Sequence, residues 1–331
     1  MQKFLIIQTA FIGDVVLATS LIEKLHNYFP DAQIDFLVRK GNESLLTAHP
    51  YIREVLVWNK KENKQLNLLK ILFAIRKKKY DKVINIQRFA ATGMLTAFSG
   101  AGETIGFDKN PFSFLFTKKI KHIVGDGTVS KHEIERNLDL ISSFTDSSPA
   151  KPVLYPSAND YNVVSLYKSG NYITVSPASV WFTKQYPADK WIDFINKVPD
   201  SYQIYLLGAP SDNLLCISIM QAVTHTGVSN LSGKLSFLQS AALMKDAAMN
   251  YVNDSAPMHF ASAMNAPVTA VYCSTVPAFG FGPLSDRKYI VEIREPLYCR
   301  PCGLHGYKAC PEKHFNCARK IEDMQLLEKL R

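Results

Sequence analysis

The chain alternates short apolar runs with segments of helical periodicity, and it does so twice along its 331 residues. Runs such as 3–7 and 82–86, each followed by a helical segment, are typical of parallel strands that helices cover on both faces. The alternation restarts after residues 145–160, which are rich in Ser, Pro and Asp and which we interpret as a linker. The pattern predicts two α/β domains with doubly wound parallel sheets, at 1–157 and 158–331.

The expected elements follow from the apolar periodicity. In the first series, strands are expected at Lys3–Ile7, Ile34–Val38, Val55–Trp58, Lys82–Ile86 and Thr104–Phe107, and helices at Asp14–Phe29, Gln65–Lys79, Ala91–Phe98 and Glu133–Phe144. In the second, strands are expected at Tyr172–Ser176, Gln203–Leu207, Met249–Asn253 and Val268–Tyr272, and helices at Pro187–Val198, Asp212–Val223, Ser236–Asp246, Ala256–Met264 and Ile321–Leu330. The last helix is the one element that could pack back on the first domain.

The chain carries a formal net charge of +9 and a pI near 9.1, which suits an anionic partner such as nucleic acid, a phospholipid surface or a phosphorylated glycan. Solubility alone is the competing interpretation. No basic and aromatic motif typical of nucleic-acid binding accompanies the charge, so we expect no nucleic-acid partner. The basic residues of the first half are Arg39, Lys40, Arg76, Lys77, Lys78, Lys79, Arg88, Lys109, Lys118, Lys119 and Lys121.

The N-terminal apolar run is short. It is cut by Asp14 and followed by no small-residue cleavage site, so we expect a buried strand rather than a signal peptide. No apolar run reaches the roughly 18 residues that a spanning helix needs. The protein is therefore expected in the cytoplasm.

Six cysteines occur, and two of them, Cys216 and Cys273, stand alone among apolar residues and are expected in the core. Disulfides are not expected in a cytoplasmic protein. The other four are spaced C-x2-C-x7-C-x6-C, a ligand count that suits zinc or an iron–sulfur centre as well as packing thiols. These four are Cys299, Cys302, Cys310 and Cys317, with His305 and His314 between them.

Polar residues at strand-to-helix turns are the candidates for a site, because ligands of open α/β sheets bind beyond the carboxyl ends of the strands. In the first turn Gly13 permits a close approach, and Asp14 is either a functional carboxylate or a plain helix cap. This turn is not GxGxxG, so it does not indicate a dinucleotide site. In the turn at 176–187, Lys184 lies among hydroxyls with no acid nearby in sequence. It is either a diphosphate ligand or an exposed loop lysine.

Two further turns carry polar groups. Between residues 253 and 261, Ser255 and its neighbours could present amides to a pyrophosphate, and Asp254 could cap the helix. His259, about one turn further, either touches a phosphate or fills the core. The turn at 207–212 adds Asp212, a carboxylate able to accept from ribose hydroxyls.

The joint order of these turns carries a resemblance to a known family. The chain reads FxGDxxLxxxLxxxL from Phe11, PxSxWxTKxxPxxxW from Pro177 and NDSxPMHxAxAxxxP from Asn253. Together these motifs resemble the ADP-heptose:lipopolysaccharide heptosyltransferases, glycosyltransferase family 9, over nearly the whole chain. The segments HEIERNLDLI at 132–141 and CRPCG at 299–303 are similar to its heptosyltransferase II branch.

The resemblance implies the GT-B architecture, in which two Rossmann-like domains face each other across a cleft and close on their substrates. The acceptor then binds mainly to the first domain and the nucleotide to the second. Asp14 matches the catalytic base and Lys184 the lysine that meets the donor phosphates, while Asp212 matches a ribose contact and Leu235 a backbone contact to adenine. The matched donor-binding positions are Ser179, Val180, Lys184, Asp212, Leu235, Asp254, Ser255, Ala256 and His259. Ser179 and Val180 replace a Thr pair of the first-heptose branch, which argues against that branch.

The implied reaction is an inverting transfer of heptose from ADP-heptose to the inner core of lipopolysaccharide, without metal or other cofactor. The acceptor is a lipid-linked acidic glycan at the cytoplasmic face of the inner membrane, with which the protein would make peripheral contact. Three alternatives stay open: a GT-B transferase using another nucleotide sugar on a different glycan, a non-catalytic nucleotide-sugar or glycan-binding protein, and a metal-dependent redox or regulatory protein centred on the cysteines. Similar cysteines recur in the second-heptose branch, and the family uses no metal for transfer.

Overall fold

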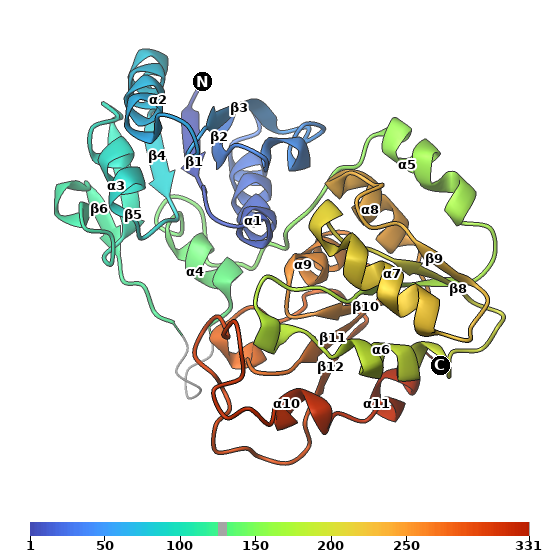
Figure 1. Cartoon of the computed structure of the whole chain (residues 1–331). Helices are drawn as coiled ribbons and strands as arrows, with labels where there is room; N and C mark the ends of the chain where they lie inside the picture. The colour runs from blue at the N-terminus through green and yellow to red at the C-terminus, as the bar shows by residue number, and fades with distance from the viewer. Residues whose placement is uncertain (125–130, 331) are drawn as a thin grey trace. The chain divides into compact units, whose positions relative to one another are not determined.

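The structure is a computed structural model that describes residues 1–124 and 131–330. Residue 331, the last of the second expected domain, lies outside the described residues. The chain forms two compact units, and the division between them falls after Tyr155, inside the expected linker (Figure 1). Each unit contains a six-stranded parallel sheet with helices, so the α/β architecture predicted from the alternation is confirmed.

The sheet of unit 1 has the strand order β3-β2-β1-β4-β5-β6. Its central strand β1, KFLII, is buried along nearly its whole length, as expected for a parallel strand covered on both faces. The strands are β1 Lys3–Ile7, β2 Gln33–Arg39, β3 Ile52–Trp58, β4 Lys82–Asn85, β5 Glu103–Phe107 and β6 Lys118–Ile120.

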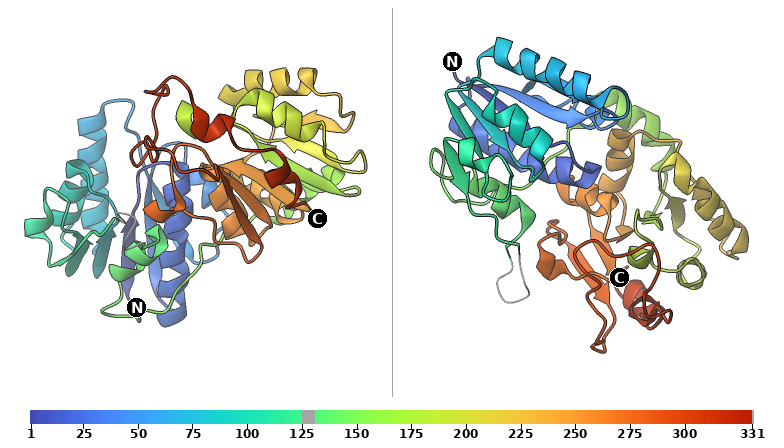
Figure 2. Two further views of the ribbon diagram at one scale, coloured as in Figure 1. Left: turned by 90° about the horizontal axis from the view of Figure 1, so that it is seen from below. Right: turned by 60° about the vertical axis from the view of Figure 1, so that its left-hand side comes forward.

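The helices of unit 1 cover the two faces of this sheet (Figure 2). Helices α2 and α3 pack together on one face, where Ile75 and Leu95 join the apolar core, and α1 packs with α4 on the other. The three leucines of the FxGDxxLxxxLxxxL motif, Leu17, Leu21 and Leu25, lie in α1 and are fully buried. The helices are α1 Ile12–Tyr28, α2 Lys64–Lys78, α3 Ala90–Ala97 and α4 Glu133–Asp139, with short 3-10 helices η1 Glu43–Leu45 and η2 Ser113–Leu115.

The sheet of unit 2 has the order β12-β11-β10-β7-β8-β9. Helix α6 packs with α7, and α8 packs with α9. The strands are β7 Tyr172–Ser176, β8 Gln203–Leu206, β9 Val228–Asn230, β10 Met249–Asn253, β11 Val268–Tyr272 and β12 Lys288–Glu292. The helices are α5 Ala158–Val164, α6 Ala188–Ile195, α7 Asn213–Ala222, α8 Phe237–Lys245, α9 Ala256–Ala263, α10 Asn316–Arg319 and α11 Met324–Leu327, with η3 Ser165–Tyr167, η4 Phe182–Lys184, η5 Pro210–Asp212 and η6 Pro277–Phe279.

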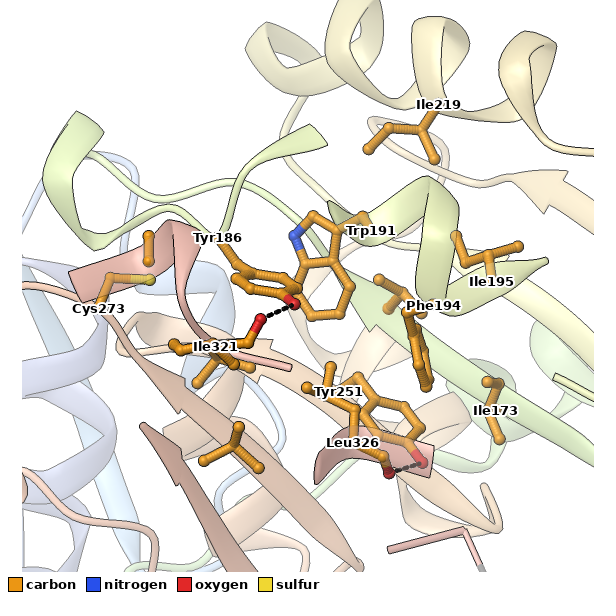
Figure 3. Close-up of a cluster of buried hydrophobic side chains, with 14 of the residues drawn as sticks. Ile173, Tyr186, Trp191, Phe194, Ile195, Ile219, Tyr251, Cys273, Ile321 and Leu326 are labelled. Carbon is orange, nitrogen blue, oxygen red and sulfur yellow. Dashed lines mark hydrogen bonds between the residues drawn. The ribbon is translucent and has the colours of Figure 1, made fainter. Parts of the chain in front are cut away.

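The C-terminal segment belongs to the core of unit 2 (Figure 3). Trp191 and Phe194 of α6 pack there with Tyr251 of β10 and with Leu326 of α11. The Tyr251 hydroxyl donates a hydrogen bond of 3.1 Å to the Leu326 carbonyl, which satisfies a buried polar group. The element that could have packed on the first domain is thus built into the second.

Strands β6, β9 and β12 were not expected, and several other elements differ from expectation at their ends or in kind. The expected long helix at 321–330 is the single turn α11, and α4 ends at Asp139, short of Phe144. The linker is not structureless throughout, because Ser157 accepts a hydrogen bond from the Asp160 amide and starts helix α5. Among the described residues, no helix has the length and apolar character needed to cross a membrane.

Candidate functional site

The sheet of unit 2 has a topological switch point between β7 and β10. From β7 the chain proceeds through β8 to β9 on one side, and it then returns to β10 on the other. The loops that leave two such strands diverge and make room for a ligand beyond the carboxyl ends. Lys184 follows β7 and Asp254 follows β10, so the strand order brings these two predicted site residues together.

Lys184 and Asp254 form an ion pair at this switch point. The Lys184 Nζ lies 2.6 Å from an Asp254 carboxylate oxygen, and the two side chains are 15% and 9% exposed. The same oxygen accepts a hydrogen bond of 2.6 Å from Thr275 Oγ1, which lies just beyond β11. The acid partner of Lys184 therefore comes from another strand, where inspection of the neighbouring sequence could not find it.

Asn253, the last residue of β10, forms hydrogen bonds with both ends of the loop that carries Lys184. Its Oδ1 accepts a hydrogen bond of 2.9 Å from the Tyr186 amide, and its Nδ2 donates one of 2.8 Å to the Pro177 carbonyl. Asn253 is fully buried, and Tyr186 reaches into the core of unit 2 (Figure 3). These bonds fix the loop against the end of β10.

The cysteine-rich segment supports the same loop from the side. The Thr183 amide donates to the Tyr307 carbonyl at 3.1 Å, and Thr183 Oγ1 accepts from the Tyr307 amide at 2.7 Å and from Ser274 Oγ at 3.0 Å. Gly306 has a φ of +73°, and a Cβ there would lie 2.8 Å from Thr183 Oγ1, so only glycine fits. The backbone of this segment is thus part of the site's support.

Helix α9 begins at the same edge of the sheet. Its N-cap residue is Ser255, so the hypothesis that Asp254 caps this helix is wrong; the Asp254 carboxylate contacts Thr275 and Lys184 instead. The first helical residue is Ala256, and amides at a helix start attract anions. His259 is buried, with 6% exposure, and a contact between it and a phosphate stays a prediction.

Asp212 and Leu235 lie beyond the ends of β8 and β9. The Asp212 carboxylate accepts a hydrogen bond of 2.8 Å from the Ala209 amide and so stabilises its own turn. The Gly233 amide donates to the Gly208 carbonyl at 2.9 Å, which ties the two turns together. Their assigned roles toward ribose and adenine stay predictions.

Ser179 and Val180 lie on the Lys184 loop. The Ser179 carbonyl accepts a hydrogen bond of 2.6 Å from Gln185 Nε2, and the Val180 side chain is 76% exposed. Ser179 and Val180 therefore belong to the loop that Asn253 holds in place, and the Val180 side chain is open to solvent.

Unit 1 has its own switch point, between β1 and β4, and Asp14 lies there. Helix α1 begins at Ile12, so Asp14 is its third residue, and its carboxylate accepts a hydrogen bond of 3.1 Å from the Phe11 amide. Thr9 Oγ1 donates to Gln87 Oε1 at 3.1 Å and joins the loops after the two strands. Asp14 therefore caps its helix. Because it lies at the switch point, it is a candidate functional carboxylate as well.

Lys60, which the sequence did not single out, lies at the same edge of unit 1. Its Nζ donates a hydrogen bond of 2.7 Å to the Thr9 carbonyl and lies 4.7 Å from the centroid of the Trp58 ring. Burial, followed by the positive charges of Arg39 and Lys64, lowers the pKa of Lys60 to about 8. A bound anion would offset this burial of charge, so Lys60 is a candidate anion ligand.

The cysteines of the described chain are free thiols. Cys216 and Cys273 are fully buried, as predicted, and Cys317 belongs to the same core with 4% exposure. Burial raises the pKa of the Cys317 thiol to about 12. Over residues 1–124 and 131–330, no three His, Cys, Asp or Glu side chains are grouped so as to hold a metal ion. The burial of Cys216, Cys273 and Cys317 is that of packing thiols.

Four supporting residues were not among the predicted site residues: Lys60, Thr183, Asn253 and Thr275. Asn253 had the clearest signal, because a polar residue that ends an apolar strand needs a buried hydrogen-bond partner. Thr275 follows a strand in the same way. Lys60 and Thr183 carried no such signal, since their environment is set by segments distant in sequence.

The chain is similar to known proteins along most of its length. The model of glycosyltransferase family 9 (heptosyltransferase) matches residues 68–308. Lipopolysaccharide heptosyltransferase 3 of Escherichia coli is 28% identical over 281 residues, covering 80% of this chain and 82% of that protein. Lipopolysaccharide heptosyltransferase 2 of Escherichia coli is 22% identical over 316 residues, with 88% of each chain covered.

The fold is shared with a solved member of this group. The structure of the Escherichia coli ADP-heptose lipopolysaccharide heptosyltransferase II aligns with a TM-score of 0.80 at 21% identity, covering 100% of this chain and 97% of the other. That similarity shows the GT-B type of fold, and the family model covers well over half of the sequence. The chain therefore belongs to glycosyltransferase family 9 (heptosyltransferase) and is a glycosyltransferase.

Proposed function

We propose that this enzyme transfers heptose from ADP-heptose to the inner core of lipopolysaccharide, with inversion at the anomeric carbon. The names of the relatives support the sugar and the acceptor. The observation that carries the proposal is the Lys184–Asp254 pair at the switch point of unit 2. A largely buried ammonium beside the start of α9 suits the diphosphate of a nucleotide sugar.

We assign the donor to unit 2. Lys184 and the amides at Ser255 and Ala256 meet the diphosphate, Asp212 meets the ribose hydroxyls, and the backbone at Leu235 meets the adenine. Ser179, Val180, Asp254 and His259 complete the assigned donor site. This assignment follows the loops that leave β7, β8, β9 and β10, all at the carboxyl edge of one sheet.

Asp254 competes with the diphosphate for Lys184. While no anion is bound, the carboxylate compensates the charge of a lysine that is mostly removed from water. A diphosphate attracts Lys184 more strongly, because it carries more negative charge, and Thr275 continues to hold Asp254. The pair keeps Lys184 oriented for the donor without leaving a buried charge unpaired.

In the proposed reaction, an acceptor hydroxyl oxygen attacks the anomeric carbon while Asp14 takes its proton. The bond from that carbon to the β-phosphate oxygen breaks, and ADP leaves with the electron pair. Negative charge therefore grows on the diphosphate, where Lys184 and the start of α9 stabilise it. These groups supply the positive potential of a metal ion, so the proposed transfer needs no metal or other cofactor.

We assign the acceptor to unit 1, whose switch point holds Asp14 and Lys60. An acidic, phosphorylated glycan would offset the desolvated charge of Lys60 and the positive charge of Arg39 nearby. Since the proposed acceptor is lipid-linked, we place the enzyme in the cytoplasm with peripheral contact to the inner face of the inner membrane.

A donor screen tests the proposal. The purified protein is incubated with ADP-heptose, UDP-sugars or GDP-sugars in turn. The release of nucleotide and the shift in melting temperature are measured for each. We expect release of ADP alone. Release of UDP or GDP would point to a transferase with another donor, and a thermal shift without release would point to a binding protein.

The base assignment is tested by Asp14→Asn, which should lower the transfer rate about 10²–10⁴-fold and leave donor affinity unchanged. Asp160→Asn is the matched control, because Asp160 is the third residue of α5 and accepts a 2.8 Å hydrogen bond from the Ser157 amide, as Asp14 does in α1. Equal activity of the two folded variants would leave Asp14 with a capping role only.

A further inference from the structure

Helix α2 of unit 1 presents large apolar side chains to solvent. Leu66, Leu69 and Phe73 are 53%, 46% and 67% exposed. Their spacing of three and four residues places them in one stripe along the helix. Single exposed apolar residues are ordinary, whereas a contiguous group is typical of an interaction surface.

The opposite side of α2 holds the helix on the sheet. Leu68, Ile71, Leu72 and Ile75 pack against the apolar core of unit 1. Figures 1 and 2 show α2 on the outside of this sheet, beside α3. Because the core contacts use the inner side, the exposed stripe is held outward on a fixed scaffold.

Basic residues share the outward side with the stripe. At 100° per residue, Lys70, Arg76 and Lys77 fall with the apolar stripe in one arc about 120° wide. Between Lys64 and Lys79 the sequence has six basic residues and no acidic one. The outer face of α2, as we call it, consists of Leu66, Leu69, Lys70, Phe73, Arg76 and Lys77.

The outer face of α2 continues onto the neighbouring elements. Arg76 Nη1 donates a hydrogen bond of 2.9 Å to the carbonyl of Phe98, which is 45% exposed at the end of α3. The Phe98 ring lies 6.3 Å from that of Phe112, and Phe114 in η2 is 73% exposed. Apolar rings and cations therefore extend over α2, α3 and η2.

We propose that the outer face of α2 docks on a membrane whose headgroups are anionic. At such a surface Lys and Arg keep their charges among the headgroups while apolar side chains enter the acyl boundary. The positive charge, with no acid on the helix, is complementary to anionic lipid, whereas two copies of this face would repel each other. The inference rests on the proposed function in one respect, namely that a lipid-linked acceptor lies at this surface.

Vesicle co-sedimentation of the full chain, without donor or acceptor, tests the surface. The wild type should bind vesicles of phosphatidylglycerol with phosphatidylcholine, should not bind phosphatidylcholine alone, and should dissociate as salt rises. The variant Lys70→Gln/Lys77→Gln should bind about 25-fold more weakly, since each basic residue near an anionic surface contributes about fivefold. Leu69→Ser/Phe73→Ser should also lose binding, and both variants change only exposed side chains.

Matched controls alter unit 2. Leu166→Ser/Leu214→Ser removes leucines that are 66% and 80% exposed, and Lys245→Gln/Lys288→Gln removes two exposed lysines. Both controls should bind vesicles like the wild type. The inference is overturned if both α2 variants bind vesicles like the wild type, or if the controls lose as much binding as the α2 variants. It is also overturned if the wild type does not bind anionic vesicles at low salt, or if it forms a dimer that the α2 variants dissociate.

Transfer assays separate this inference from the proposed function. The α2 variants should keep the wild-type rate on a delipidated, water-soluble acceptor and lose rate on the same acceptor in anionic vesicles. Equal rates on both forms would overturn the docking surface. A protein that binds vesicles but turns over no ADP-heptose would contradict the proposed function and support the docking surface.

Discussion

Replacing Asn253 with alanine should loosen the loop that carries Lys184. The side chain is fully buried and makes hydrogen bonds to the Tyr186 amide at 2.9 Å and to the Pro177 carbonyl at 2.8 Å. Alanine removes these two bonds together with the longer ones from Nδ2 to the Ser176 and Ala178 carbonyls, at 3.4 and 3.5 Å. Since Tyr186 stays packed in the core, the loop should become mobile near Lys184 without leaving the unit.

The expected loss of stability follows from these two bonds. A buried hydrogen bond contributes about 1 kcal/mol net, and a buried group left without a partner costs about 1–3 kcal/mol. We therefore expect the free energy of unfolding to fall by about 2–5 kcal/mol in Asn253→Ala. The melting temperature should fall by about 2–4 °C for each kcal/mol in a unit of this size.

Donor affinity should fall as well, because Lys184 would no longer be held at the switch point. Denaturant unfolding measures the first effect and ADP binding by calorimetry the second. Asn250→Ala is the matched control, since Asn250 on the same strand is also fully buried and bonds the Met244 and Pro267 carbonyls at 2.9 and 2.8 Å, away from the donor loop. Equal loss of ADP affinity in both variants would refute the positioning role of Asn253. Unchanged stability of Asn253→Ala would refute the stabilisation assigned to its hydrogen bonds.

Three further predictions concern charge. Lys184→Ala should weaken ADP binding at least about tenfold and change the acceptor KM little, because the substitution leaves the Asp254 carboxylate facing the diphosphate. Unchanged ADP affinity in calorimetry would contradict this prediction. Because Lys60 has a pKa lowered to about 8, it loses its charge above that pH, so the acceptor KM should rise between pH 7 and 9 in the wild type and not in Lys60→Gln. EDTA should leave the transfer rate unchanged. A rate that falls in EDTA and is restored by Mg²⁺ or Mn²⁺ would contradict metal-free transfer.

The central strands could be predicted from sequence because each is buried on both faces and consists mainly of apolar and β-branched residues. β1, β7, β10 and β11 begin and end where the sequence predicts them. The three strands that sequence analysis missed all lie at sheet edges. β6 reads KKI and β9 reads VSN, three residues each, and β12 alternates exposed and buried positions. These three edge strands are partly solvated and short of apolar residues, so none of them carries a long apolar run.

The individual turns of the site could also be predicted, but their pairing could not. Polar residues after Ser176 and Asn253 were identified from sequence alone. That Lys184 meets Asp254 depends on β7 lying beside β10, which follows from the strand order and not from local sequence. Thr275 joins the pair because β11 lies beside β10 on the other side.

The cysteine-rich segment acts on this site through its backbone and through Arg300. The Arg300 guanidinium donates to the Cys273 carbonyl and to the Thr275 carbonyl, each at 2.8 Å, and so fastens the segment to the end of β11. Thr275 in turn holds the carboxylate that pairs with Lys184. A continuous set of contacts therefore leads from this segment to Lys184, and none of its steps uses a thiol. For this reason we interpret the segment as support for the loop that carries Lys184.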